Sequence, residues 1–163
     1  MWPPTILAAA EAVLAEARAK GLRLTTAESC TGGLVAGALT AIAGSSDVFE
    51  RGFVTYSNDA KVEDLGVPAE TIETHGAVSE PTVRAMAEGA LDYSNADVSV
   101  AVTGIAGPGG GTAEKPVGLV HFAAARNGRD TVALIHRFGD IGRDEVRSTS
   151  VQVALDLLRR MLA

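Results

Sequence analysis

The stretch from Asp97 to Phe138, DVSVAVTGIAGPGGGTAEKPVGLVHFAAARNGRDTVALIHRF, decides the fold class. Its first part, Asp97 to Gly104, is apolar and rich in valine, which predicts a buried strand. After a glycine-rich loop, two more strands are predicted at Val117 to Ala125 and at Thr131 to Phe138. Asn127-Gly128 between these two is a hairpin signal, so we expect this pair to be antiparallel.

The rest of the chain alternates between helical and strand patterns around this stretch. Apolar spacing, caps and glycines predict helices at Thr5 to Lys20, Leu34 to Ala43, Asn58 to Leu65, Ser79 to Asp92 and Arg143 to Leu162, and strands at Leu22 to Ala27 and Gly52 to Ser57. We expect Thr5 and Ser79 to cap their helices and Gly21 to end the first one. The pattern predicts one α/β domain over residues 1–163, with a mixed sheet that carries helices on both faces.

Composition excludes several classes of function. The chain has 163 residues, 14 basic and 20 acidic, so its net charge of −6 argues against a nucleic-acid partner. Aromatic residues make up only 4%, too few for base-stacking platforms. The Ala-rich stretch Ile6 to Ala19 is interrupted by charges, and no signal peptide is visible, so we expect no membrane contact and a cytoplasmic location. The single cysteine and the spacing of the three histidines predict neither a disulfide nor a metal site.

The first stretch that suggests chemistry is TTAESCTGG, residues 25–33, where a predicted strand gives way to a helix. Ser29 is the candidate nucleophile there, and the alternative is that it only caps the helix. Cys30 is a rival nucleophile, or else a small buried apolar residue. The glycine pair Gly32-Gly33 favours the close approach of another group to the backbone.

The second stretch is TYSNDAK, residues 55–61, which follows the next predicted strand and can reach the same end of the sheet. Lys61 is a candidate general base if burial lowers its pKa, and the alternative is a solvated helix residue. Its separation of 32 residues from Ser29 means that any contact between them must come from the tertiary fold.

The third stretch is AVTGIAGPGGGT, residues 101–112, in which a strand runs into glycines. Its backbone amides can bind an anion, unless the loop is merely a flexible surface segment. Thr103 and Gly104, at the end of the strand, are candidate substrate-binding residues. Arg143 is a candidate ligand for an anionic group, or else it pairs with surface acids such as Asp144.

Together, TAESCTGG, YSNDAK and VTGIAGPGGGTAEKPVG resemble the CinA C-terminal domain family, in order and over nearly the whole chain. This family includes stand-alone nicotinamide mononucleotide deamidases. The resemblance implies a three-layer α/β/α fold, a homodimer or higher homo-oligomer, and a bacterial cytoplasmic amidase without a cofactor. It also implies that five functional residues of the family have counterparts in this chain. These are the serine Ser29, the lysine Lys61, the tyrosine Tyr56, the strand-end threonine Thr103 and the arginine Arg143.

The expected reaction converts nicotinamide mononucleotide to nicotinate mononucleotide and ammonia. In this hypothesis Lys61 deprotonates Ser29, and Tyr56 relays a proton or orients Lys61. The backbone amides around Cys30, Thr31, Gly32 and Gly33 stabilise the oxyanion. The alternatives are a non-catalytic nucleotide-binding module, a Ser–Lys amidase or esterase for another small substrate, and, more remotely, a partner in DNA uptake.

Overall fold

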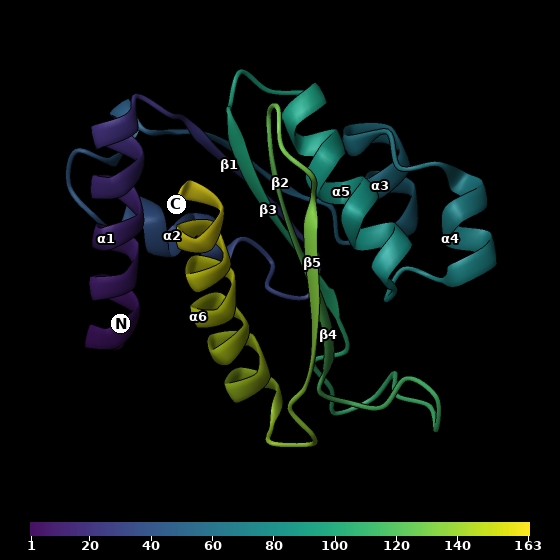
Figure 1. Ribbon diagram of the computed structural model, residues 1–163. Coiled ribbons are helices and arrows are strands. Elements are labelled where there is room, and N and C mark those ends of the chain that lie inside the picture. The colour runs from purple at the N-terminus through teal and green to yellow at the C-terminus, as the bar shows by residue number, and fades with distance from the viewer.

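The computed structural model describes all residues from 1 to 163 and contains a five-stranded mixed sheet (Figure 1). The strand order is β2-β1-β3-β4-β5, in which β1 pairs in parallel with β2 and β3, and the last two pairs are antiparallel. The strands are β1 (Leu24–Glu28), β2 (Phe49–Val54), β3 (Val98–Gly104), β4 (Leu119–Arg126) and β5 (Val132–Arg137). The predicted mixed sheet with a late antiparallel hairpin is therefore confirmed.

Helices cover both faces of the sheet and complete the predicted three-layer α/β/α arrangement (Figure 1). One layer contains α1 (Pro4–Lys20), α2 (Leu34–Thr40) and α6 (Arg143–Leu162). The other contains α3 (Asn58–Leu65), α4 (Ala69–His75) and α5 (Glu80–Asp92), and the short 3-10 helix η1 (Ser45–Asp47) precedes β2. No helix is both long enough and apolar enough to cross a lipid bilayer.

Alternation along the central strands gives the two faces different side-chain sizes. On β3, Val98, Val100 and Val102 belong to the larger core of 27 buried residues, which also includes α1 and α6. The intervening Ala101 and Ser99 face the other layer, where the Ser99 hydroxyl donates to Ala87 O at 2.6 Å. Small side chains on this face let α5 lie close to the sheet.

The parallel strands place three loops at one edge of the sheet. Glu28, at the end of β1, is in register with Val54 at the end of β2 and with Val102 near the end of β3. The segments that follow these strands begin with Ser29, Thr55 and Ile105. The three stretches singled out in the sequence therefore emerge at the same edge of the sheet.

Several element boundaries differ from the prediction. The second strand was expected at Gly52 to Ser57 but occupies Phe49–Val54, because the chain leaves the sheet when Ser57 caps α3 by accepting a hydrogen bond from Ala60 N. Helix α4 was missed, since Ile72 is its only buried residue and gives no apolar repeat. Helix α2 ends at Thr40, three residues earlier than expected.

The predicted helix caps are partly correct. Ser79 caps α5, and Gly21 ends α1 in the left-handed conformation, as expected. Thr5 is not a cap, because α1 already starts at Pro4 and its N-cap position is Pro3. Pro4 is favourable at the first helical position because the first amides of a helix have no intrahelical acceptor.

Candidate active site

The segment from Ser29 to Gly33, here called the nucleophile turn, joins β1 to α2. Ser29 N donates to Val102 O at 2.9 Å, which ties the start of the turn to β3, and Gly32 N donates to Ser29 O at 3.0 Å. Ser29 does not cap α2, whose N-cap is Gly33 with no side-chain cap bond. The alternative of a mere capping serine is therefore wrong.

Glu28, which sequence analysis did not single out, caps α2 instead. Its side chain is fully buried, and its two carboxylate oxygens accept hydrogen bonds from Val35 N at 2.8 Å and Ala36 N at 3.0 Å. Burial raises the pKa of Glu28, while these backbone donors oppose the rise. The only sequence signal was an acid at the end of a buried strand, next to the candidate nucleophile.

Lys61 lies within hydrogen-bond distance of Ser29 although 32 residues separate them. Lys61 Nζ is 3.1 Å from Ser29 Oγ, 2.9 Å from Thr55 O and 3.4 Å from Ser57 O. The residue is only 1% exposed, so the alternative of a solvated helix lysine is wrong. Helix α3 points this side chain at the nucleophile turn because Ser57 and the end of β2 fix where the helix starts.

The surroundings of Lys61 favour its neutral form. Burial lowers the pKa of Lys61, and no carboxylate lies within ion-pair distance, 4.0 Å, of Nζ to restore it. A neutral amine has two N–H donors and one lone pair. The two carbonyls of Thr55 and Ser57 can take the donors, which leaves the lone pair for the hydroxyl proton of Ser29.

Cys30 has the opposite properties from an activated thiol. It is buried, and burial raises the pKa of the thiol to about 12. A thiol with that pKa is almost entirely protonated near neutral pH and is a poor nucleophile. Of the two candidates in the turn, the structure favours Ser29.

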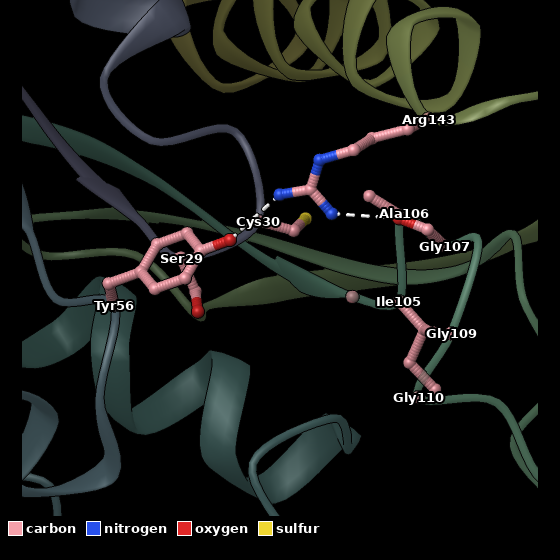
Figure 2. Close-up of a pocket in the computed structure, with 10 residues that line it drawn as sticks. Ser29, Cys30, Tyr56, Ile105, Ala106, Gly107, Gly109, Gly110 and Arg143 are labelled. Carbon is pink, nitrogen blue, oxygen red and sulfur yellow. Dashed lines mark hydrogen bonds between the residues drawn. The ribbon is translucent and has the colours of Figure 1, made fainter.

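A pocket of about 250 Å³ lies beside Ser29 (Figure 2). Its walls come from the start of the nucleophile turn, from Tyr56, from the loop after β3 and from the start of α6. The lining residues are Ser29, Cys30, Tyr56, Gly104, Ile105, Ala106, Gly107, Gly109, Gly110 and Arg143. Of these, Ile105, Ala106 and the three loop glycines were quoted in the sequence but not chosen as candidates.

Arg143 spans the pocket between Tyr56 and the glycine loop, as Figure 2 shows. Its Nη1 donates to Gly107 O at 2.8 Å and its Nη2 to the Tyr56 hydroxyl at 2.9 Å. It forms no ion pair, so the alternative in which it pairs with a surface acid is wrong. A guanidinium without a carboxylate partner keeps its charge available for an anionic ligand.

Several backbone amides at the site have no acceptor in the protein. The N–H groups of Cys30 and Thr31 donate to no other residue, and the same holds for Ala106, Gly107, Gly109 and Gly110 in the loop. All of these residues except Thr31, which is fully buried, line the pocket, and unpaired amides there are suited to oxyanions and phosphates. Gly32 N is already bonded to Ser29 O, so the expectation that it serves an oxyanion is not supported.

Three predicted site residues lie elsewhere than expected. Thr103 is buried and absent from the pocket wall, and it donates its hydroxyl to Ala77 O at 3.0 Å, which ties β3 to the segment before α5. Gly33 is absent from the pocket wall and has Val54 beside its Cα. The hydroxyl of Tyr56 contacts Arg143 and makes no hydrogen bond to Lys61.

The fold and the site define the class: an α/β protein in which a buried lysine contacts a partly buried serine beside a pocket at the carboxyl edge of its parallel strands. The chain belongs to the CinA C-terminal domain family, whose model matches residues 7–162. The family resemblance seen in the sequence is therefore confirmed.

Individual relatives agree with this assignment. A CinA-like protein of Parasynechococcus marenigrum is 56% identical over 155 residues, which cover 94% of this chain and 36% of that protein. A CinA-like protein of Anaeromyxobacter dehalogenans is 54% identical over 151 residues, 92% of this chain and 36% of the relative. The chain thus spans about a third of the length of these curated relatives.

Solved structures match the chain over all or nearly all of its length. The competence/damage inducible protein CihA from Agrobacterium tumefaciens has a TM-score of 0.98 and 53% identity, with 100% of this chain and 99% of that chain covered. A CinA superfamily protein from Klebsiella pneumoniae has a TM-score of 0.91 and 39% identity, covering 96% and 97% of the two chains.

Proposed function

We propose that this protein hydrolyses the carboxamide of nicotinamide mononucleotide, releasing ammonia and nicotinate mononucleotide. The observation that carries the chemistry is the buried Lys61 amine 3.1 Å from Ser29 Oγ, with no acid beside it. The substrate comes from the family resemblance, and the pocket supports it through the uncompensated Arg143 and the unpaired loop amides.

Acylation of the enzyme is the first half of the proposed reaction. Lys61 takes the proton of the Ser29 hydroxyl as Oγ attacks the carboxamide carbon, and the amide oxygen becomes an oxyanion. The N–H group of Cys30, which lines the pocket, stabilises that oxyanion. When the C–N bond breaks, Lys61 returns the proton to the leaving nitrogen, so that ammonia departs and an ester of Ser29 remains.

Hydrolysis of this ester is the second half. Lys61 takes a proton from a water molecule as its oxygen attacks the ester carbon. Collapse of the second tetrahedral intermediate breaks the bond to Oγ, and the proton on Lys61 restores the Ser29 hydroxyl. The net reaction consumes one water per amide and requires neither a metal nor a redox cofactor.

Substrate binding uses the other side of the pocket. In the proposal, Arg143 and the amides of Ala106, Gly107, Gly109 and Gly110 bind the 5′-phosphate. Tyr56 is 59% exposed and borders the pocket, so its ring is available to contact the cationic pyridinium. Since its hydroxyl contacts Arg143, we assign Tyr56 to binding and to the orientation of Arg143 and not to proton relay.

The test is ammonia release by the purified chain with nicotinamide mononucleotide, nicotinamide riboside and free nicotinamide. We expect the mononucleotide to be preferred and Ser29→Ala to lose at least about 10³-fold in kcat. The exposed Ser46→Ala is the matched control and keeps the wild-type rate. Preference for an amide without phosphate contradicts the proposed substrate, and full turnover by Ser29→Ala contradicts the nucleophile.

A further inference from the structure

Arg147 lies one turn after Arg143 on α6, and its side chain contacts backbone carbonyls of the nucleophile turn. Its Nε donates to Cys30 O at 3.1 Å and its Nη2 to Thr31 O at 3.4 Å. The side chain is partly buried and forms no ion pair with any acid. Its full charge therefore faces two successive carbonyl groups beside the nucleophile.

Gly32 makes room for this guanidinium. A Cβ at position 32 would lie 3.3 Å from Arg147 Nη2, tighter than an ordinary contact, and the φ of +57° is one that other residues rarely adopt. The glycine pair Gly32-Gly33 predicts that another group approaches the backbone closely. At Gly32 the approaching group is a side chain of the protein itself.

We propose that Arg147 is a positioning residue that orients and polarises the peptide groups of the nucleophile turn for oxyanion binding. The inference rests on the proposed acyl-transfer chemistry of Ser29. Thr31 O and Gly32 N–H belong to one peptide group, and Gly32 N–H donates to Ser29 O, whose own peptide group carries the unpaired Cys30 N–H at the pocket. A guanidinium on Thr31 O makes Gly32 N–H a stronger donor to Ser29 O, and this in turn makes Cys30 N–H a stronger donor to an oxyanion in the pocket.

The fork of an arginine is needed for this task. Two nitrogens of one rigid guanidinium reach two neighbouring carbonyls, whereas a lysine ammonium at the same place is a single point charge. The orientation of both peptide groups depends on the fork, and the additional positive charge favours an oxyanion that forms nearby. We therefore expect lysine to substitute only in part.

The experiment compares Arg147→Met, Arg147→Lys and Arg147→Ala with Arg160→Met, which replaces an exposed arginine of the same helix whose side chain makes no hydrogen bond. We expect Arg147→Met to lose about 10–100-fold in kcat, with KM changed much less, and Arg160→Met to match the wild type. Arg147→Lys should lie between them. Millimolar guanidinium chloride should restore part of the kcat of Arg147→Ala without affecting the wild type.

A second readout separates this inference from the proposed substrate. A fluorophosphonate probe, which labels activated serines, should label Ser29 of the wild type and label Arg147→Met about 10–100-fold more slowly. If no ammonia is released but the labelling rates differ in this way, the substrate is wrong and the role of Arg147 stands. Equal labelling rates, a loss confined to KM, or a wild-type chain that the probe does not label would overturn the role of Arg147.

Discussion

Lys61 holds its amine in the interior of the protein with no acid within ion-pair distance. Its hydrogen bonds to Thr55 O and Ser57 O partly replace water, but they do not replace a counter-charge. A charged ammonium at this position is therefore costly, and burial lowers its pKa. The same feature that destabilises a charged lysine makes it available as a base for Ser29.

This environment predicts how stability depends on pH. In the interval between the lowered pKa and the ordinary lysine pKa of about 10.4, the unfolded chain holds a proton on Lys61 that the folded chain lacks. The contribution of Lys61 to the free energy of unfolding therefore rises with pH across that interval. Below the lowered pKa both states are protonated, and the cost of the buried charge is present in full.

The measurement is urea unfolding of the wild type and Lys61→Met over a series of pH values. The free energy of unfolding of the wild type, minus that of Lys61→Met, should increase as pH rises through the interval. Lys20→Met, at an exposed lysine, controls for loss of a surface charge. A difference that does not change with pH would show that Lys61 titrates alike in both states.

At the scale of elements, the junction of β1 with α2 determines where Ser29 lies. Glu28 ends the strand and at the same time caps the helix through Val35 N and Ala36 N, so strand and helix are joined by one side chain. The nucleophile turn is held between them, and Arg147 on α6 holds it from a third element. Its geometry thus depends on contacts that none of these elements makes alone.

Glu28→Gln tests the junction. An amide offers one acceptor oxygen where the carboxylate offers two, so one of the two α2 amides loses its partner in a buried place. We expect a loss of about 1–2 kcal/mol in the free energy of unfolding at neutral pH, measured by chemical denaturation. Glu63→Gln, an exposed glutamate of α3, should change it by less than about 0.5 kcal/mol. Equal stability of both variants would contradict the capping role.

At the scale of the whole molecule, the site depends on how closely α3 and α5 pack. Gly89 of α5 faces the carbonyl of Leu65, the last residue of α3, and a Cβ at position 89 would overlap that oxygen. Since α3 carries Lys61, the spacing of these two helices also sets the distance between the amine and Ser29.

Gly89→Ala should therefore affect both stability and activity. The added methyl group meets rigid backbone, so we expect a loss of about 1–3 kcal/mol, seen in thermal or chemical unfolding. Ammonia release should fall as well, because α3 must move away from α5. Asp92→Ala, at an exposed position of the same helix, is the control and should change stability by less than about 0.5 kcal/mol. Unchanged stability in Gly89→Ala would contradict the close packing described here.

By itself, the sequence determined the order and type of most elements. Valine-rich alternation marked β3, Asn127-Gly128 marked the hairpin, and apolar spacing marked α6. These features depend on nearby residues, which is why local patterns predict them. The family, too, was visible in three local motifs.

Only the tertiary structure decided which side chains meet. The Ser29–Lys61 contact, the Tyr56–Arg143 bond and the reach of Arg147 to the nucleophile turn join residues 32, 87 and 116–117 positions apart. At Thr103 the local pattern was misleading. Its position at the end of a strand predicted contact with a ligand, but in the folded chain its hydroxyl donates to Ala77 O. The direction of a side chain depends on helix packing and strand register across the whole chain, and no short stretch of sequence contains that information.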